Sequence, residues 1–168
     1  MLSVDKSHYP HMTEKKERKR PSHNEIFSVR GRPNILFVTV GSKNRKPLFA
    51  TPEAHQSLKR AWMEADHWLV GRYMILPDHI HFFSSPSQSP ASSLRVWIKF
   101  WKRLVSLSDT FLSKKDLWLP DCWDTQIHNG QHYTDKWAYV RENPVRAALV
   151  TRSDEWPYQG ELNTLSWR

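Results

Sequence analysis

The chain has 168 residues, a formal net charge of +8 and a pI near 9.7. This length suits one domain with a proper core, and the basic charge predicts a polyanionic partner, nucleic acid first. The one cysteine, Cys122, excludes an intrachain disulfide framework and a cysteine-rich zinc site. No apolar run approaches the roughly 20 residues that cross a bilayer, and the first residues lack the apolar stretch of a signal peptide. We therefore expect a cytoplasmic protein that does not enter the membrane.

The first residues differ in composition from the rest of the chain. Residues 1–24 are poor in apolar side chains and contain a basic run at 15–20, in which Glu17 is the one residue that is not Lys or Arg. We expect a flexible basic N-terminal tail over 1–24, which is either solvated or contacts phosphates, and a single domain over 25–168.

Hydrophobic patterning predicts strands and helices from residue 35 onwards. The β-rich run 35–40 is nearly continuous in its hydrophobicity, which is typical of a central strand covered on both faces. Thr51 followed by Pro52 predicts the start of a helix that ends near residue 66. Two further strands, 68–75 and 76–83, flank a Pro-Asp turn.

The second half of the chain continues the alternation. The predicted elements are a Ser/Pro-rich loop at 84–90, a helix from Ser92 or Ser93 to Val105, a polar connection at 106–117, an irregular strand at 118–128 and a short helix at 131–142. The order predicts an α+β fold: a ferredoxin-like sandwich with a largely antiparallel sheet of about four strands and helices packed on it.

Basic side chains lie between the apolar positions of the helix that ends at Val105. Such a face is either solvated surface or a nucleic-acid contact, and the net charge favours contact. The candidate DNA-binding residues, including two near the end of the last helix, are Arg95, Lys99, Lys102, Arg103, Arg141 and Arg146.

Two histidines stand out on the strand 76–83. His79 and His81 point to the same face because side chains alternate along a strand, whereas Ile80 points to the other face. Two imidazoles on one face make half of a metal site. The alternative is that they are simply polar residues on a half-buried strand.

The last predicted helix offers a hydroxyl and an amide. Tyr139 and Asn143 are four residues apart and share a helix face with Asp135, whereas Tyr133 points to the far side. The alternative is an ordinary half-buried tyrosine and a helix C-cap. The sequence lacks a Walker loop, a His-Glu-x-x-His motif, a zinc-deaminase signature and a Gly-x-Ser-x-Gly elbow, which excludes the corresponding chemistries.

Three blocks, at 77–83, 122–124 and 139–150, resemble in order and spacing those of the REP-associated tyrosine transposases, which are single-tyrosine transposases with a histidine-hydrophobic-histidine motif. The resemblance runs from about residue 35 to 157. It implies a ferredoxin-like sheet and cleavage of single-stranded DNA beside an imperfect, REP-like hairpin. The roles it implies are metal ligation by His79 and His81, nucleophilic attack by Tyr139, and a third-ligand position at Asn143.

The sequence departs from that family at two positions. His128 stands where Arg is more usual, which leaves open a DNA contact there, and Ala148 stands where Gly is common. Neither change removes a catalytic group that the resemblance implies.

The implied chemistry is transesterification with a divalent metal. Two imidazoles and an amide oxygen suit Mg or Mn better than closed structural zinc, and we expect Mg in the cell. Attack by Tyr139 would leave a 5′-phosphotyrosine without a nucleotide cofactor. Two other readings are a binding module that holds structured nucleic acid without cutting it, and a metal-dependent nuclease that uses water. A monomer is favoured over a dimer.

Overall fold

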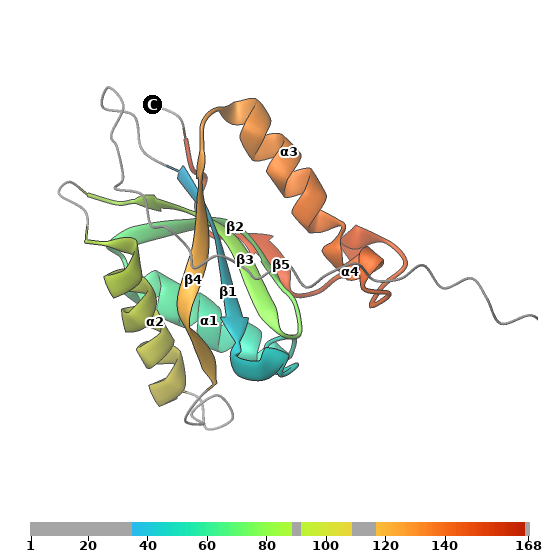
Figure 1. Cartoon of the computed structure of the whole chain (residues 1–168), viewed down its shortest axis with the longest axis horizontal. Helices are drawn as coiled ribbons and strands as arrows, with labels where there is room; N and C mark the ends of the chain where they lie inside the picture. Colours follow the sequence, from blue (N-terminus) through green and yellow to red (C-terminus); the bar gives the residue numbers. More distant parts are fainter. Residues whose placement is uncertain (1–34, 89–91, 109–116, 167–168) are drawn as a thin grey trace, which may run out of the picture.

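A five-stranded antiparallel sheet, with strand order β4-β1-β3-β2-β5, organises the structure (Figure 1). The computed structural model describes residues 35–88, 92–108 and 117–166, so the predicted tail 1–24 and most of the predicted connection 106–117 lie outside the described residues. The elements are β1 (Ile35–Ser42), η1 (Lys43–Arg45), α1 (Pro52–Glu64), β2 (Trp68–Ile75), β3 (His79–Pro86), α2 (Leu94–Ser108), β4 (Trp118–Ile127), α3 (Gly130–Arg141), α4 (Asn143–Arg146), η2 (Ser153–Glu155) and β5 (Gln159–Glu161).

The predicted α+β class is confirmed. The first four strands and first two helices follow the order βαββαβ, and β3 lies antiparallel between β1 and β2, as in a ferredoxin-like fold. The prediction of about four strands missed β5, which pairs with β2 through Arg72 and Glu161. A three-residue strand carries too little alternation to be recognised in a sequence.

The two faces of the sheet are covered by different helices (Figure 1). Val38 and Val40 of β1 and Phe82 of β3 are fully buried in the core that includes α1 and α2. Phe37 and Phe83 point the other way, where Phe83 packs against α3. The strand β1 is therefore buried on both faces, as its continuous hydrophobicity predicts.

Local interactions set several boundaries. Thr51 caps α1 by accepting a hydrogen bond on Oγ1 from the amide of Ala54 at 3.1 Å. The predicted loop at 84–90 is wrong for its first residues, because Ser84 pairs with Val70 and its hydroxyl donates to the Leu69 carbonyl. The predicted irregular strand is β4, an edge strand, which is where Pro120 is tolerated.

No helix among the described residues combines the length and the apolar character needed to cross a membrane.

Candidate metal and nucleic-acid site

His79 and His81 lie on β3 and face the side of the sheet that α3 covers. Across the neighbouring strand, His81 is paired with Thr39 and His79 with Gly41. The two imidazole rings lie 4.7 Å apart, centroid to centroid, and are nearly perpendicular. The structure therefore brings the predicted histidine pair together on one face.

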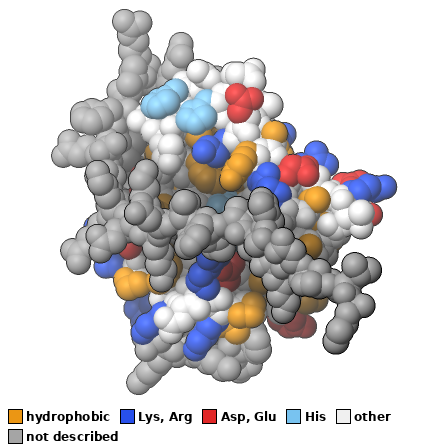
Figure 2. Space-filling view, turned by 45° about the vertical axis from the view of Figure 1, so that its right-hand side comes forward, with side chains coloured by type: hydrophobic (Ala, Val, Ile, Leu, Met, Phe, Trp, Pro, Cys, Tyr) orange, Lys and Arg blue, Asp and Glu red, His pale blue; other side chains and the backbone are white. Residues whose placement is uncertain are grey.

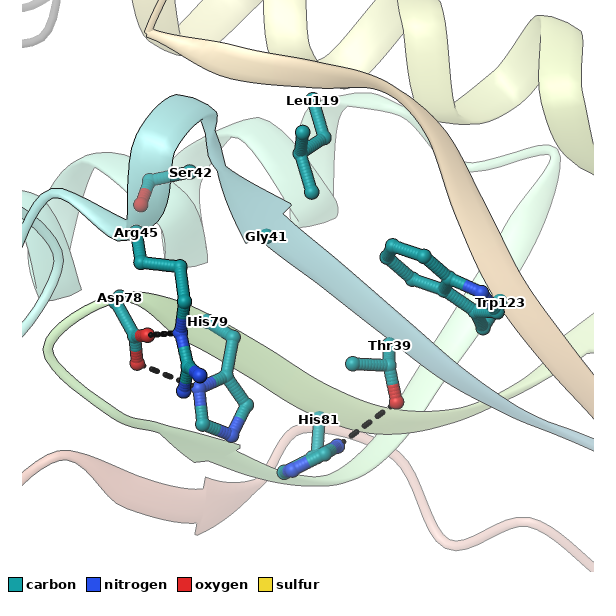
Figure 3. A pocket seen from close by; sticks show the side chains of 9 residues that line it. All are labelled: Thr39, Gly41, Ser42, Arg45, Asp78, His79, His81, Leu119 and Trp123. Atoms are coloured by element: carbon teal, nitrogen blue, oxygen red, sulfur yellow. Dashed lines mark hydrogen bonds and ion pairs between the residues drawn. The ribbon is translucent and has the colours of Figure 1, made fainter. Parts of the chain in front are cut away.

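Each imidazole is held through its Nδ1 atom (Figure 3). His79 Nδ1 lies 2.6 Å from Asp78 Oδ1, and His81 Nδ1 lies 2.9 Å from Thr39 Oγ1. Metal-binding histidines commonly bond their second nitrogen to a carboxylate, a hydroxyl or a carbonyl, which fixes the ring and its tautomer. These bonds leave the Nε2 atom of each ring as the nitrogen that can bind an ion.

The surroundings of His81 favour its neutral form. Burial, followed by the charges of His79 and Lys136, lowers the pKa of His81 to about 3. Burial would raise the pKa of Asp78, but hydrogen bonds from Arg45 and His79 outweigh it and the pKa is lowered. Because a metal ion binds the neutral imidazole, His81 is in the state that ligation requires at neutral pH.

A pocket opens beside the histidines, lined also by Arg45, Leu119 and Trp123. Within the described part of the chain, no group of three or more His, Cys, Asp and Glu side chains is placed to hold a metal ion. The pair therefore offers two nitrogen ligands beside an open pocket rather than a closed cage. That donor set fits a catalytic divalent ion whose remaining positions are taken by water, phosphate or an amide oxygen.

Tyr139 lies on the last turn of α3, and Asn143 is the first residue of α4. The Tyr139 side chain is 64% exposed, and the Arg146 guanidinium lies over its ring, 4.2 Å from the centroid. Arg146 also donates to the Tyr139 carbonyl, and to Asn143 Oδ1 at 2.5 Å. Neither Tyr139 nor Asn143 lines the histidine pocket, although α3 covers the same face of the sheet.

The two tyrosines of α3 point in different directions, as their spacing predicts. The Tyr133 ring packs on Phe83 with centroids 4.0 Å apart, and burial raises the pKa of Tyr133. Tyr139 instead faces solvent on the last turn of the helix.

The end of α4 shows why Ala148 is an unusual choice. Its φ of 55° is left-handed, and the amides of Ala148 and Leu149 donate to the carbonyls of Val145 and Pro144. This is a Schellman motif, whose left-handed position is usually Gly.

The predicted DNA-binding residues do not form one patch. Lys99 and Arg103 are exposed on α2, which packs on the sheet face opposite α3, and Arg95 forms an ion pair with Asp121 at 2.6 Å. Arg141 and Arg146 are exposed near Tyr139. On the face shown in Figure 2, Lys and Arg side chains likewise occupy several separate places, with acidic side chains among them.

The placement of Lys102 on an exposed basic face is wrong. Lys102 is only 6% exposed, and its ammonium donates to the Leu119 carbonyl at 2.9 Å. Burial lowers its pKa to about 8. Lys102 is among the buried residues of α2, and its long side chain reaches β4.

Sequence reasoning missed Lys136 and Arg45. The Lys136 ammonium lies 5.4 Å from the centre of the Phe37 ring and close enough to His81 to lower its pKa. Its spacing from Tyr133 and Val140, which both pack toward the sheet, indicates this position. Nothing in the sequence pattern singles out Arg45, which follows β1 and reaches Asp78.

Comparisons with known proteins find REP-associated tyrosine transposases, the family that the three sequence blocks resemble. No protein-family model matches the chain. The REP-associated tyrosine transposase of Escherichia coli (strain K12) is 25% identical over 126 residues, which are 73% of this chain and 73% of that protein. A solved structure of a REP-associated tyrosine transposase bound to a REP hairpin superposes with a TM-score of 0.68 at 20% identity, covering 82% of this chain and 81% of that one. The predicted resemblance is thus confirmed: this chain is a homologue of a REP-associated tyrosine transposase and has the α+β fold of one.

Proposed function

We propose that this protein is a metal-dependent endonuclease and strand transferase that cuts single-stranded DNA beside a hairpin. The observation that carries the proposal is the histidine pair, with both Nδ1 atoms held and both rings beside an open pocket. It lies on the sheet face that α3 covers, the helix whose last turn carries Tyr139. The sequence similarity to a tyrosine transposase supports the same function.

His79 and His81 would hold the divalent ion, Mg or Mn, through their Nε2 atoms. When bound, such an ion polarises a phosphate oxygen and stabilises the charge that develops during displacement. Asn143 would supply a third ligand. Its Oδ1 accepts a hydrogen bond from Arg146, so ligation would share or replace that bond.

Tyr139 would act as the nucleophile. Its hydroxyl oxygen attacks the phosphorus, the phenolic proton is lost, and the bond from phosphorus to the 3′-oxygen of the upstream nucleotide breaks as that oxygen takes up a proton. The products are a 5′-phosphotyrosine and a free 3′-hydroxyl. Because one phosphoester replaces another, the bond energy is kept for rejoining and no nucleotide cofactor is needed.

The DNA partner would be a hairpin with a single-stranded 5′ flank. The net charge of +8 favours binding of a polyanion. The solved relative is bound to a REP hairpin, and Arg141 and Arg146 of this chain lie beside the proposed nucleophile. A single copy carries every proposed catalytic residue, so a monomer would suffice.

One observation favours a second candidate, a binding module that does not cut. Arg146 lies over one face of the Tyr139 ring, and Tyr139 does not line the histidine pocket, so the arrangement suits attack only if DNA brings the helix end and the pocket together. Covalent capture separates the two candidates, and it also separates both from a nuclease that uses water.

The test is a single strand that carries the hairpin and a 3′ label, incubated with Mg or Mn and resolved under denaturing conditions. The wild type should give a labelled protein band, because the downstream piece stays attached through its 5′-phosphate. Tyr139→Phe should bind DNA and metal but give no band, whereas the matched variant Tyr133→Phe should form it. Wild-type cleavage by Tyr139→Phe, or an adduct mapped by peptide mass to Tyr133, contradicts the assignment.

A further inference from the structure

Arg45 presents a guanidinium at the rim of the histidine pocket (Figure 3). Its Nε donates to Asp78 Oδ2 at 2.8 Å, while its side chain remains 83% exposed. Among the described residues, neither Nη group of Arg45 has a hydrogen-bond partner. The guanidinium is therefore anchored at one nitrogen and offers its other donors to the pocket, which is the geometry that binds a phosphate with two parallel hydrogen bonds.

The backbone that carries Arg45 is unusual. Asn44 and Arg45 have φ values of 59° and 54°, a left-handed conformation that costs a residue with a side chain roughly 1–2 kcal/mol. Asp78, which holds Arg45, uses its other oxygen to hold His79. One carboxylate therefore fixes both the guanidinium and a histidine, and the paired Arg45 charge offsets the repulsion of an incoming phosphate by Asp78.

The opposite wall of the pocket is apolar and aromatic. It consists of Leu119 and Trp123 of β4 (Figure 3). Trp123 is paired with Thr39, and Thr39 with His81, so these residues form one row across three strands. Because adjacent strands are about 4.8 Å apart, the backbones of Trp123 and His81 lie roughly 10 Å from each other. A sugar that joins a base on the indole to a phosphate near the histidines spans such a gap.

Lys102 and Gly41 position the apolar wall formed by Leu119 and Trp123. Lys102 donates to the Leu119 carbonyl at 2.9 Å, which fixes the start of β4 where its register with β1 shifts. Gly41 lies beneath Leu119, and a Cβ at this position would come within 3.0 Å of the Leu119 Cδ1 atom. A larger residue at 41 would push the wall or fill the floor of the pocket.

From this arrangement we propose that the pocket binds one nucleotide of the DNA strand, with its base stacked on Trp123 and its phosphate on Arg45. The proposal rests on the proposed function for the identity of the strand, but it is independent of which group attacks. Aromatic faces beside cations are the usual means of holding single strands, because every base has a face that can stack.

Binding of labelled single strands tests both halves of the site. The probes are a fluorescein-labelled twelve-residue oligothymidylate and an abasic strand of the same length, and the protein is the full chain with Tyr139→Phe and Mg, so that nothing is cut. Trp123→Ala should weaken binding of the oligothymidylate by about 5- to 50-fold and leave binding of the abasic strand unchanged. Trp123→Phe should retain most of the affinity, since a smaller ring still stacks.

The phosphate contact of Arg45 is tested by the salt dependence of strand binding. Arg45→Ala should weaken binding of both strands and reduce the slope of log affinity against log salt by about one. The matched control is Arg60→Ala, which removes one exposed Arg from α1 on the opposite face of the sheet. It should change neither the affinity for the two strands nor the salt slope.

Several results would overturn the nucleotide site. Equal affinity of the Tyr139→Phe protein with and without Trp123→Ala for oligothymidylate excludes stacking, and an equal loss on the abasic strand shows that the base is not what Trp123 binds. A salt slope for Arg45→Ala identical to that of Arg60→Ala excludes the phosphate contact. If Trp123→Ala does not fold, cross-linking of bromodeoxyuridine strands to the wild type decides instead: the adduct should map to the peptide containing Trp123, and mapping elsewhere rejects the site.

The adduct assay keeps this proposal separate from the catalytic one. If no tyrosine adduct forms but the Trp123 and Arg45 effects appear, the catalytic proposal fails and the nucleotide site stands. If the adduct forms and neither substitution changes strand binding, the nucleotide site is rejected and the catalytic proposal stands.

Discussion

The histidine pocket and the end of α3 are held in place by different means. His79 and His81 sit on a central strand, and each ring is bonded to a neighbouring side chain at Nδ1. Tyr139 lies on the last turn of a helix with most of its side chain in solvent, and its main tether is one arginine that is itself exposed. Under the proposed function, the histidine pair must be rigid to define the geometry of a bound ion, whereas Tyr139, which would attack and later release DNA, benefits from freedom. Changes in the pocket should therefore affect ion binding, and changes at the helix end should affect rate.

The largest effect should come from removing the histidine pair. His79→Ala/His81→Ala should abolish the strong site in a calorimetric titration with Mn, because both nitrogen ligands are lost. The loss should exceed the roughly 10- to 100-fold that outer-shell changes cost. A second close pair of histidines among the described residues provides the control: His128→Ala/His132→Ala, which removes two stacked imidazoles outside the pocket, should leave the titration unchanged. Equal Mn binding by the wild type and the first variant would reject the metal site.

The groups that hold the imidazoles should have the next largest effect. Thr39→Val keeps the shape but removes the hydroxyl beside His81 Nδ1, and Asp78→Asn removes the charge beside His79. Each should weaken Mn binding by about 10-fold or more. Thr125→Val, at an exposed position on the same sheet, is the matched control. Unaltered affinity in both pocket variants would mean that the bonds at Nδ1 do not orient ligands.

A smaller effect, mainly on rate, is expected at the helix end. Arg146→Ala removes the cation over the Tyr139 ring and the donor to Asn143. Single-turnover cleavage at saturating DNA should slow by up to about 10-fold, because a misplaced nucleophile reacts slowly, while the histidine pair keeps the strong Mn site. Arg141→Ala removes one charge nearby and should weaken DNA binding without slowing that step. A loss of Mn binding in Arg146→Ala would show that the two regions are not independent.

The smallest effect concerns the turn after α4. Ala148→Gly should raise the free energy of unfolding by about 1 kcal/mol, because glycine adopts the left-handed conformation without a steric cost. Ala147→Gly should instead lower it by roughly 0.5–1 kcal/mol, since Ala147 has a φ of −85°. Urea unfolding of the two variants measures the difference, and a stabilising Ala147→Gly would contradict the explanation.

Periodicity was sufficient to predict much of this fold. The strand that begins at Trp68 has the bounds that its pattern predicts, and the cap at Thr51 is local chemistry that a sequence displays directly. The shared face of His79 and His81 follows from a period of two. These features depend on neighbours in the chain, so they are visible in a sequence.

The remaining features depend on contacts between distant residues. Lys102 is buried and its ammonium donates a hydrogen bond to the Leu119 carbonyl of β4, although a lysine on an amphipathic helix normally faces water. Arg45 reaches Asp78 only because a left-handed turn follows β1. The expected convergence of Tyr139 with the histidines depends on how far α3 stands from the sheet, which helical spacing does not determine.

The edges of the sheet have a consequence for how copies of this protein meet. One edge is β4, which contains Pro120 and a register shift, and the other is β5, which has three residues. Proline removes an amide donor, an irregular register misaligns the rest, and a short strand offers few groups to pair. Neither edge is a good template for a strand from another molecule. At the high concentrations reached in expression or refolding, the folded protein should therefore resist the edge-to-edge stacking by which exposed sheets grow into fibrils.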